Sequence, residues 1–140
     1  MPAFVLDASV AVSWCFPGDP AEDTPYSRRV LRELAANDAV VPEIWAFEIA
    51  HSIYVPYSKR KRITERQVVE YVILLTALPI RVGPQDLWAN VKVESLARRH
   101  GFTAYDAAYI ALAEATSSIL CTTDEKLSKG HSAGLILVKA

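Results

Sequence analysis

The stretch VLDASVAVSW, residues 5–14, predicts how the fold begins. The short apolar run Ala3–Leu6 is followed by Asp7, and a second apolar segment, Val10–Phe16, then continues until a Pro-Gly pair ends it. A four-residue apolar run suits a buried strand, whereas the longer segment suits a helix. We therefore expect a strand that turns directly into a helix, with a carboxylate at the turn.

The same alternation of short apolar runs and longer segments continues along the chain. Further strands are predicted at Ala39–Val41, Ile80–Val82, Ser118–Cys121 and Leu135–Val138. Further helices are predicted at Thr24–Ala36, Ile44–Tyr57, Thr64–Ala77, Leu87–His100, Thr103–Ala115 and, as a short turn, Asp124–Lys129. Strands alternating with helices indicate an α/β sandwich around a mostly parallel central sheet. With 140 residues, the chain is expected to form a single domain over residues 1–140.

Composition and charge exclude several classes of protein. With 51% apolar and 22% charged residues, the chain has the composition of a folded domain rather than a disordered one. Fifteen Lys and Arg against sixteen Asp and Glu give a net charge of −1, which argues against a partner held by bulk electrostatics, such as DNA or an anionic membrane. Two distant cysteines, no signal peptide and no apolar run of membrane length predict a soluble, cytoplasmic protein without a zinc site or disulfide framework.

Three carboxylates are isolated within apolar segments. Asp7 is the only charged residue among the first eighteen, and Glu48 and Asp106 are each the only charged residue of an apolar helical segment. A helix that is apolar nearly all round is buried, so we expect Glu48 and Asp106 to be drawn into the interior. An ionised carboxylate there is strongly destabilising unless it is paired or binds a metal ion.

A fourth carboxylate, Asp124, follows the predicted strand Ser118–Cys121, as Asp7 follows the first strand. In open α/β sheets, sites form beyond the carboxyl ends of the strands, which brings these two acids together. Converging carboxylates without a basic partner form a hard-oxygen site, suited to Mg²⁺ or Mn²⁺ rather than zinc. The three histidines are too widely spaced to form a local ligand pair. The sequence thus predicts a divalent-cation site suited to phosphoryl chemistry.

Each of these acids also has a purely structural interpretation. The structural role is capping of the first helix by Asp7 or Ser9, capping of its own short helix by Asp124, and a Thr-x-x-Asp capping box for Asp106. An ion pair with an Arg from elsewhere in the chain accounts for Glu48. The sequence alone leaves both interpretations open, but four such acids in one fold pattern favour the metal site.

Four segments, in order along the chain, carry one of these acids each. They are VLDASVAVSW (5–14), PEIWAFEIAHSI (42–53), TAYDAAYIALAEA (103–115) and CTTDEKL (121–127). Together they resemble the PIN-domain ribonucleases, and within that family the VapC toxins of prokaryotic VapBC toxin–antitoxin pairs. The resemblance extends over essentially the whole chain. One departure is His51, because VapC-like sequences often carry Asn at this position.

The resemblance implies a fold, a site, an activity and partners. The fold is a three-layer α/β/α PIN-like domain. The site has four acidic catalytic metal ligands and two supporting hydroxyls: Asp7, Glu48, Asp106, Asp124, Ser9 and Thr123. The activity is that of an endoribonuclease, in which Mg²⁺ (or Mn²⁺) activates a water molecule that cleaves structured RNA, either tRNA or an rRNA loop. The partners are a second copy of the chain, in a homodimer, and a VapB-like antitoxin that blocks the active site.

The alternative function is that of a non-catalytic PIN-fold module that binds RNA or protein. Loss of one of the four acids would favour it, and all four are present. A phosphoacceptor receiver domain lacks support, since no paired acids follow the first strand.

Two further groups of residues have open roles. The basic segment Lys59, Arg60, Lys61 and Arg62 is a candidate RNA-binding rim, extended by Arg66, Arg98 and Arg99, with a solvated helix end as the alternative. Core packing is expected for Tyr105, Tyr109, Trp45, Trp88 and the stretch Tyr71–Leu78, with nucleotide stacking as the alternative for the first two and a partner surface for the others.

If the four acids share one cleft, the net charge of −1 is an average over an acidic pocket and a mildly basic exterior. The remaining surface then carries 15 basic and 12 acidic groups, a balance of +3. A bound divalent cation also reverses the sign of the cleft. The net charge of −1 therefore does not exclude a nuclease.

Overall fold

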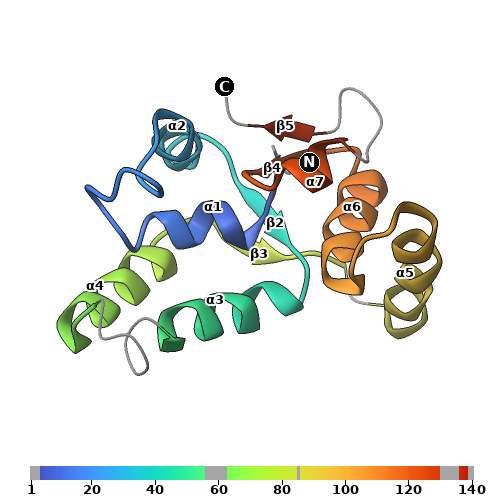
Figure 1. Ribbon diagram of the computed structural model, residues 1–140, viewed down its shortest axis with the longest axis horizontal. Coiled ribbons are helices and arrows are strands. Elements are labelled where there is room, and N and C mark those ends of the chain that lie inside the picture. The colour runs from blue at the N-terminus through green and yellow to red at the C-terminus, as the bar shows by residue number, and fades with distance from the viewer. Residues whose placement is uncertain (1–3, 56–62, 85, 130–135, 139–140) are drawn as a thin grey trace.

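The computed structural model describes residues 4–55, 63–84, 86–129 and 136–138 (Figure 1). Its strands are β1 (Phe4–Leu6), β2 (Ala39–Val41), β3 (Ile80–Val82), β4 (Ile119–Thr122) and β5 (Ile136–Val138). Its helices are α1 (Ala8–Ser13), α2 (Pro25–Glu33), α3 (Ile44–Tyr54), α4 (Glu65–Thr76), α5 (Leu87–His100), α6 (Ala104–Thr116) and α7 (Glu125–Lys129). Each predicted strand and helix is present. Within these ranges, no helix combines the length and the apolar character needed to cross a membrane.

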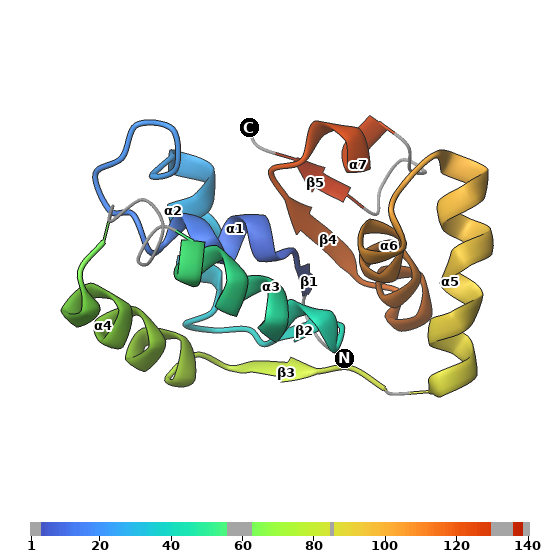
Figure 2. The same cartoon turned by 60° about the horizontal axis from the view of Figure 1, so that its bottom comes forward.

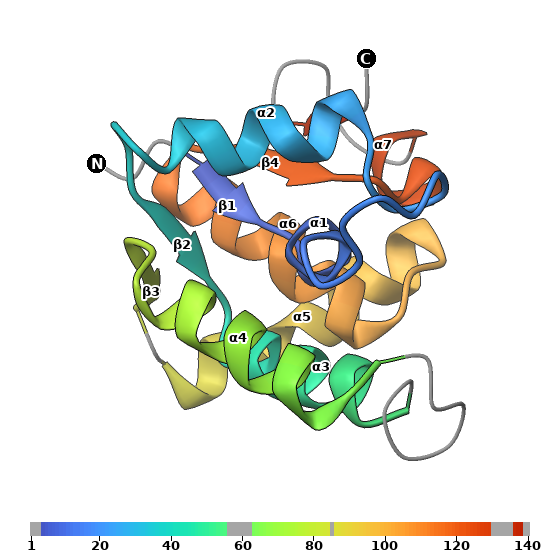
Figure 3. The same ribbon diagram turned by 90° about the vertical axis from the view of Figure 1, so that its left-hand side faces the viewer.

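The described strands form one sheet in the order β3-β2-β1-β4-β5, and all neighbouring strands are parallel. β1 lies at the centre, where Phe4 is opposite Ala39 of β2 on one side and opposite Ile119 of β4 on the other. Figure 3 shows α1 in front of these central strands and α6 behind them. The predicted mostly parallel sheet is therefore confirmed.

Alternation along β1 divides the core into two parts. Phe4 and Leu6 pack in a cluster with residues of α1, α2, α3 and α4, whereas Val5 between them packs in a second cluster with residues of α6. Helices therefore cover both faces of the sheet, with α5 packed on the outside of α6. Figure 2 shows the sheet between these two groups of helices. The three-layer α/β/α architecture is confirmed.

The first strand leads directly into the first helix at Asp7. The Asp7 N–H donates to the carbonyl of Cys121 in β4 at 3.0 Å, so the pairing with β4 continues to the last residue before α1. The helix then starts at Ala8 rather than at the predicted Val10. The backbone at Asp7 is therefore held by the sheet on one side and by the helix on the other.

Helix α3 is less buried than its apolar composition indicates. It buries Ile49 and Ile53, but Phe47 is 78% exposed and Tyr54 is 53% exposed. The reason is that α3 packs mainly against α1 rather than directly on the sheet, so only one of its faces is covered. Glu48, expected in the interior, is accordingly half-buried.

The aromatic residues with expected core positions divide into two groups. Trp45 contacts both core clusters and Tyr71 is buried, as predicted. Trp88 and Tyr105 are 67% and 61% exposed, so the prediction is wrong for these two. Trp88 belongs to α5, which packs on α6 and not on the sheet and therefore leaves its outer face in solvent.

Substitution of Leu120, which lies opposite Val5 of β1, provides a test of packing in the core. Its side chain is fully buried in β4, so Leu120→Ala is expected to lower the free energy of unfolding by about 2–5 kcal/mol. Ile119, the preceding residue, is 43% exposed and provides the control. Ile119→Ala is expected to cost about 1 kcal/mol or less. Urea denaturation measures both, and equal losses would contradict the burial of Leu120 and the partial exposure of Ile119.

Candidate active site

The topology of the sheet brings two of the predicted acids together. β1 and β4 are neighbours, although β2 and β3 lie between them in the sequence. The chain runs outward from β1 to β3 and then returns to β4 on the other side of β1, which makes this a switch point. Ligand sites of open parallel sheets lie beyond the carboxyl ends of the strands at such a point. Asp7 directly follows β1, and Asp124 lies just after β4.

A pocket of about 400 Å³ lies at this position. Its acidic lining residues are Asp7, Glu22, Glu48, Asp106 and Asp124, and its hydroxyl-bearing ones are Ser9, Ser52 and Thr123. No Lys or Arg is among the described residues that line it. The structure thus brings together all four acids that the sequence analysis selected, and it adds Glu22 from the loop before α2.

Asp7 is the most deeply buried of these acids. Its Oδ2 accepts hydrogen bonds from Thr122 Oγ1 at 2.6 Å and from Ser9 Oγ at 2.7 Å. Asp7 occupies the N-cap position of α1, yet its side chain makes no capping hydrogen bond. The capping interpretation is therefore wrong for Asp7. Because both hydroxyls bind the same oxygen, neither of them occupies Oδ1.

The two hydroxyls on Asp7 also contact the segment after β4. Thr122 Oγ1 accepts from the Asp124 N–H at 3.0 Å, and Ser9 Oγ accepts from the Thr123 N–H at 3.4 Å. Ser9 therefore contacts Asp7 as expected of a supporting hydroxyl. Thr123 lines the pocket, but the threonine hydroxyl on Asp7 belongs to Thr122, which the sequence analysis did not select.

Glu48 reaches the pocket from α3 and is bound to α6. Its Oε1 accepts a hydrogen bond from the hydroxyl of Tyr109 at 2.6 Å. Within the described part of the chain, no Lys or Arg forms an ion pair with Glu48. Tyr109 is buried, as predicted, and its contact with Glu48 is a feature that the sequence analysis missed. His51, three residues after Glu48, is exposed.

Asp106 and Asp124 lie at the starts of helices. The hydroxyl of Thr103 caps α6 by accepting from the Asp106 N–H at 3.1 Å. Asp124 Oδ1 accepts from the Lys126 N–H at 2.9 Å, at the start of α7. Both residues therefore take part in helix capping, Asp106 through its backbone N–H and Asp124 through its side chain. Since both residues also line the pocket, the capping and site interpretations are compatible here.

Burial and neighbouring charges raise the pKa values of Asp7, Glu48 and Asp106. The pKa of Asp7 is raised mainly by burial and further by the charge of Asp106, although its two hydroxyl hydrogen bonds oppose the rise. Burial also raises the pKa of Glu48, with the charges of Asp7 and Asp106 adding to it. The pKa of Asp106 is raised by burial and by the charge of Asp124. The four carboxylates thus act as one electrostatic group.

Lys126 is a described cation whose charge acts on this group. Its positive charge opposes the rise in the pKa of Asp106. Its ammonium lies 5.9 Å from the centre of the Phe102 ring, just before α6. Among the described residues, no Lys or Arg forms an ion pair with any of the four acids, so most of their negative charge has no partner in this part of the chain.

The donor set of the pocket fits a hard divalent cation. The side-chain donors are all oxygens, and no Cys or His is among the described lining residues. Within the described ranges, no three Asp, Glu, His or Cys side chains converge closely enough to enclose a metal ion. An open arrangement suits Mg²⁺, which usually keeps several of its waters and takes few carboxylates.

Only part of the predicted RNA-binding rim lies within the described residues. The segment Lys59–Arg62 lies outside the described residues. Arg66 and Arg98 each form an ion pair one turn away on their own helix, with Glu70 and Glu94 respectively. Their charges are therefore partly compensated on α4 and α5.

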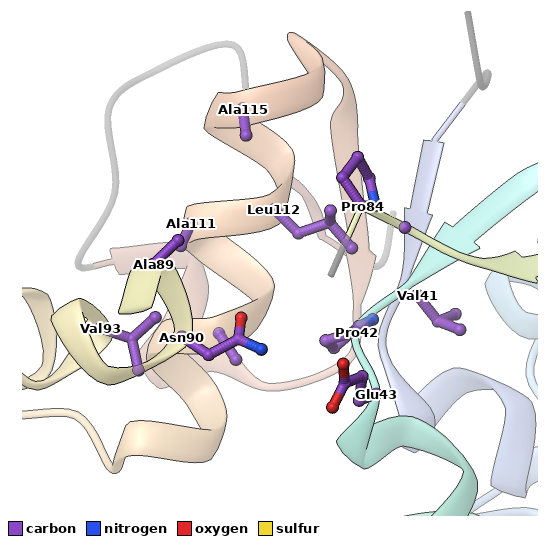
Figure 4. A pocket seen from close by; sticks show the side chains of 12 residues that line it. Val41, Pro42, Glu43, Pro84, Ala89, Asn90, Val93, Ala111, Leu112 and Ala115 are labelled. Atoms are coloured by element: carbon purple, nitrogen blue, oxygen red, sulfur yellow. The ribbon is translucent and has the colours of Figure 1, made fainter. Parts of the chain in front are cut away.

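A second pocket, of about 110 Å³, lies between the β2–α3 connection and helices α5 and α6 (Figure 4). Its lining is largely apolar, with Val41, Val93 and Leu112 among the residues labelled in the figure. Glu43 is the one carboxylate among its described lining residues. A single acid in apolar surroundings does not provide the donors that a hard cation requires, so the acidic pocket is the candidate active site.

A three-layer α/β/α fold with a carboxylate pocket at the switch point of a parallel sheet defines a class of small α/β domains suited to metal-dependent chemistry. The family model of the PIN domain matches residues 4–130, so the chain belongs to the PIN domain family. PIN domains have a nuclease-type fold and are typically metal-dependent nucleases that act on RNA.

A solved structure agrees with this assignment. The chain is similar to the crystal structure of PAE2754 from Pyrobaculum aerophilum, with a TM-score of 0.66 and 15% sequence identity. The similarity covers 96% of this chain and 90% of the other. At this identity, the likeness shows the fold alone. No curated protein matches the chain in sequence.

The raised pKa of Asp7 predicts how substitution affects the metal-free protein. A raised pKa means that the folded protein holds this proton more tightly than the unfolded chain, so stability is lost as the pH rises through the raised pKa. Asp7→Asn removes this loss. Its stability relative to wild type in EDTA is expected to increase with pH, by up to about 1.4 kcal/mol per pH unit.

Urea denaturation at a series of pH values measures this difference. The control is Glu114→Gln, which removes an exposed acid of α6 that does not line the pocket. It is expected to change the free energy of unfolding by about 0.5 kcal/mol or less at any pH. If the difference in unfolding free energy between Asp7→Asn and wild type stays constant with pH, the pKa of Asp7 is not raised in the folded protein.

Proposed function

We propose that this chain is a Mg²⁺-dependent endoribonuclease, with Mn²⁺ as an alternative cation. The observation that carries this proposal is that Asp7, Glu48, Asp106 and Asp124 line one pocket, and that no described Lys or Arg lines it. Because burial and mutual repulsion raise the pKa values of the first three, the pocket gains from a bound divalent cation. Membership of the PIN family supports the same chemistry.

The residues of the pocket have different proposed roles. On this proposal, Asp7, Asp106 and Asp124 would be the direct ligands of the cation, and Ser9 and Thr122 keep Asp7 in one orientation through its Oδ2. Glu48 is a further ligand or orients the attacking water. When bound, Mg²⁺ supplies the positive charge that activates water and stabilises the departing 3′ oxygen.

A more specific proposal is that the chain is the VapC toxin of a VapBC pair. The support is the resemblance of its four acid-bearing segments to that group of PIN domains. On this proposal, the chain is a single PIN domain in the cytoplasm, acts as a homodimer on tRNA or an rRNA loop, and is inhibited by a VapB-like antitoxin. A neighbouring gene for a small protein with a DNA-binding motif, whose product relieves the toxicity of this chain, would support it.

Cleavage of total RNA by the purified protein tests the proposed activity. Cleavage is expected with Mg²⁺, and excess EDTA is expected to abolish it. Asp106→Asn is expected to reduce the rate at least about 100-fold, since losing even a group that only orients a metal ligand typically costs about 10–100-fold. Glu114→Gln is the matched control and should retain the wild-type rate.

Two outcomes would overturn the proposed activity. Cleavage that persists unchanged in EDTA or in Asp106→Asn would come from another source. Tight RNA binding without metal-dependent cleavage would instead favour the non-catalytic PIN-fold module.

Lys126 is expected to contact an RNA phosphate beside the acidic pocket, because its charge already acts on Asp106. Lys126→Ala is expected to weaken RNA binding, measured with Ca²⁺ in place of Mg²⁺. It should also reduce the slope of log affinity against log salt concentration by about 0.7, the value for one contact to a single strand. Lys92→Ala, on the exposed surface of α5, is the control. Equal slopes for both variants would remove Lys126 from the RNA interface.

A further inference from the structure

Tyr109 makes a contact that its packing role does not require. Its side chain is 1% exposed, and its hydroxyl donates to Glu48 Oε1 at 2.6 Å. This hydrogen bond joins α6 to α3, which are separated in the sequence by β3 and two other helices. A buried phenol and a carboxylate of the acidic pocket are thus directly linked.

Glu48 needs such a link more than the other acids do. The side chain of Asp7 is held by two hydroxyls, and its backbone N–H is bonded to β4. Asp106 lies in the capped first turn of α6. Glu48 has a longer side chain on α3, a helix that packs mainly on α1 and leaves much of its surface exposed. Its neighbours Asp7 and Asp106 repel it when they are charged. Without a hydrogen bond, this repulsion favours turning the carboxylate out of the pocket.

The position of Tyr109 on α6 suits this task. Asp106 and Tyr109 are three residues apart, so they lie on the same face of the helix, one turn from each other. Asp106 lines the pocket directly, while Tyr109 reaches it through Glu48. A single rigid helix therefore sets the places of two of the four carboxylates.

We propose that Tyr109 is a positioning residue, which holds the Glu48 carboxylate in the pocket so that its second oxygen, Oε2, is available to a divalent cation. The proposal rests on the proposed metal-dependent function, and it goes beyond it by assigning the orientation of Glu48 to a residue outside the acidic set. Tyr109 itself does not touch the cation.

The chain contains a matched control for the loss of a buried phenol. Tyr71 of α4 is also buried, and its hydroxyl donates to the carbonyl of Ala11 in α1. Tyr71 does not line the acidic pocket. Tyr71→Phe and Tyr109→Phe therefore remove the same chemical group from similar surroundings, and only the second change affects a carboxylate of the site.

A double-mutant cycle on Mn²⁺ binding tests the proposal. The dissociation constant is measured by electron paramagnetic resonance for wild type, Tyr109→Phe, Glu48→Ala, the double variant and Tyr71→Phe, after melting curves confirm that each is folded. Tyr109→Phe is expected to weaken binding by about 10-fold or more, in the range found when the partner of a metal ligand is lost. In the Glu48→Ala background, the same change is expected to alter binding less than about twofold, because the group that Tyr109 positions is gone.

The outcomes separate this proposal from the proposed function. If wild type binds Mn²⁺ and Asp106→Asn does not, but Tyr109→Phe binds like Tyr71→Phe, the positioning role is wrong and the metal site stands. A loss of the same size with and without Glu48 would also overturn the positioning role, since it would show a general packing effect. If wild type binds no Mn²⁺, both proposals fail.

Discussion

The hydrogen bonds of Ser9 and Thr122 to one oxygen of Asp7 are the interactions on which the site depends. They join the end of β1 to the end of β4, the two neighbouring strands at the switch point of the sheet. They also hold a carboxylate that is 7% exposed in a single orientation. Since the same two hydroxyls accept from the backbone after β4, the segment that carries Asp124 is held at the same point.

Helix α6 is the second organising element of the site. It packs on the sheet with its apolar face and brings Asp106 to the pocket with its first turn. One turn later, Tyr109 binds Glu48 of α3, so this helix also links Glu48 to the other acids. Burial and mutual repulsion raise the pKa values of Asp7, Glu48 and Asp106, so their charged forms are disfavoured in the metal-free protein. Such local instability is common where a protein site is built for a ligand.

Much of the fold could be predicted from the sequence, because its strands are short apolar runs and its helices are longer segments between them. The four acids could also be selected, because an isolated charge in an apolar segment is conspicuous. Thr122 and Tyr109 could not, since a threonine at a strand end and a tyrosine in a buried helix are both ordinary core residues. Their roles appear only when Leu6 is paired with Cys121 and when α3 meets α6.

The positions of the strands and helices, and the acids that lack a local partner, could be inferred from the amino-acid sequence without knowledge of the fold. Both follow from short-range patterns, namely the length of each apolar run and the spacing of charges within it. The strand order, the partial exposure of Glu48 and the hydroxyl that binds Asp7 could be seen only in the folded protein. These depend on contacts between segments far apart in the chain, such as β1 with β4, and local periodicity carries no information about such contacts.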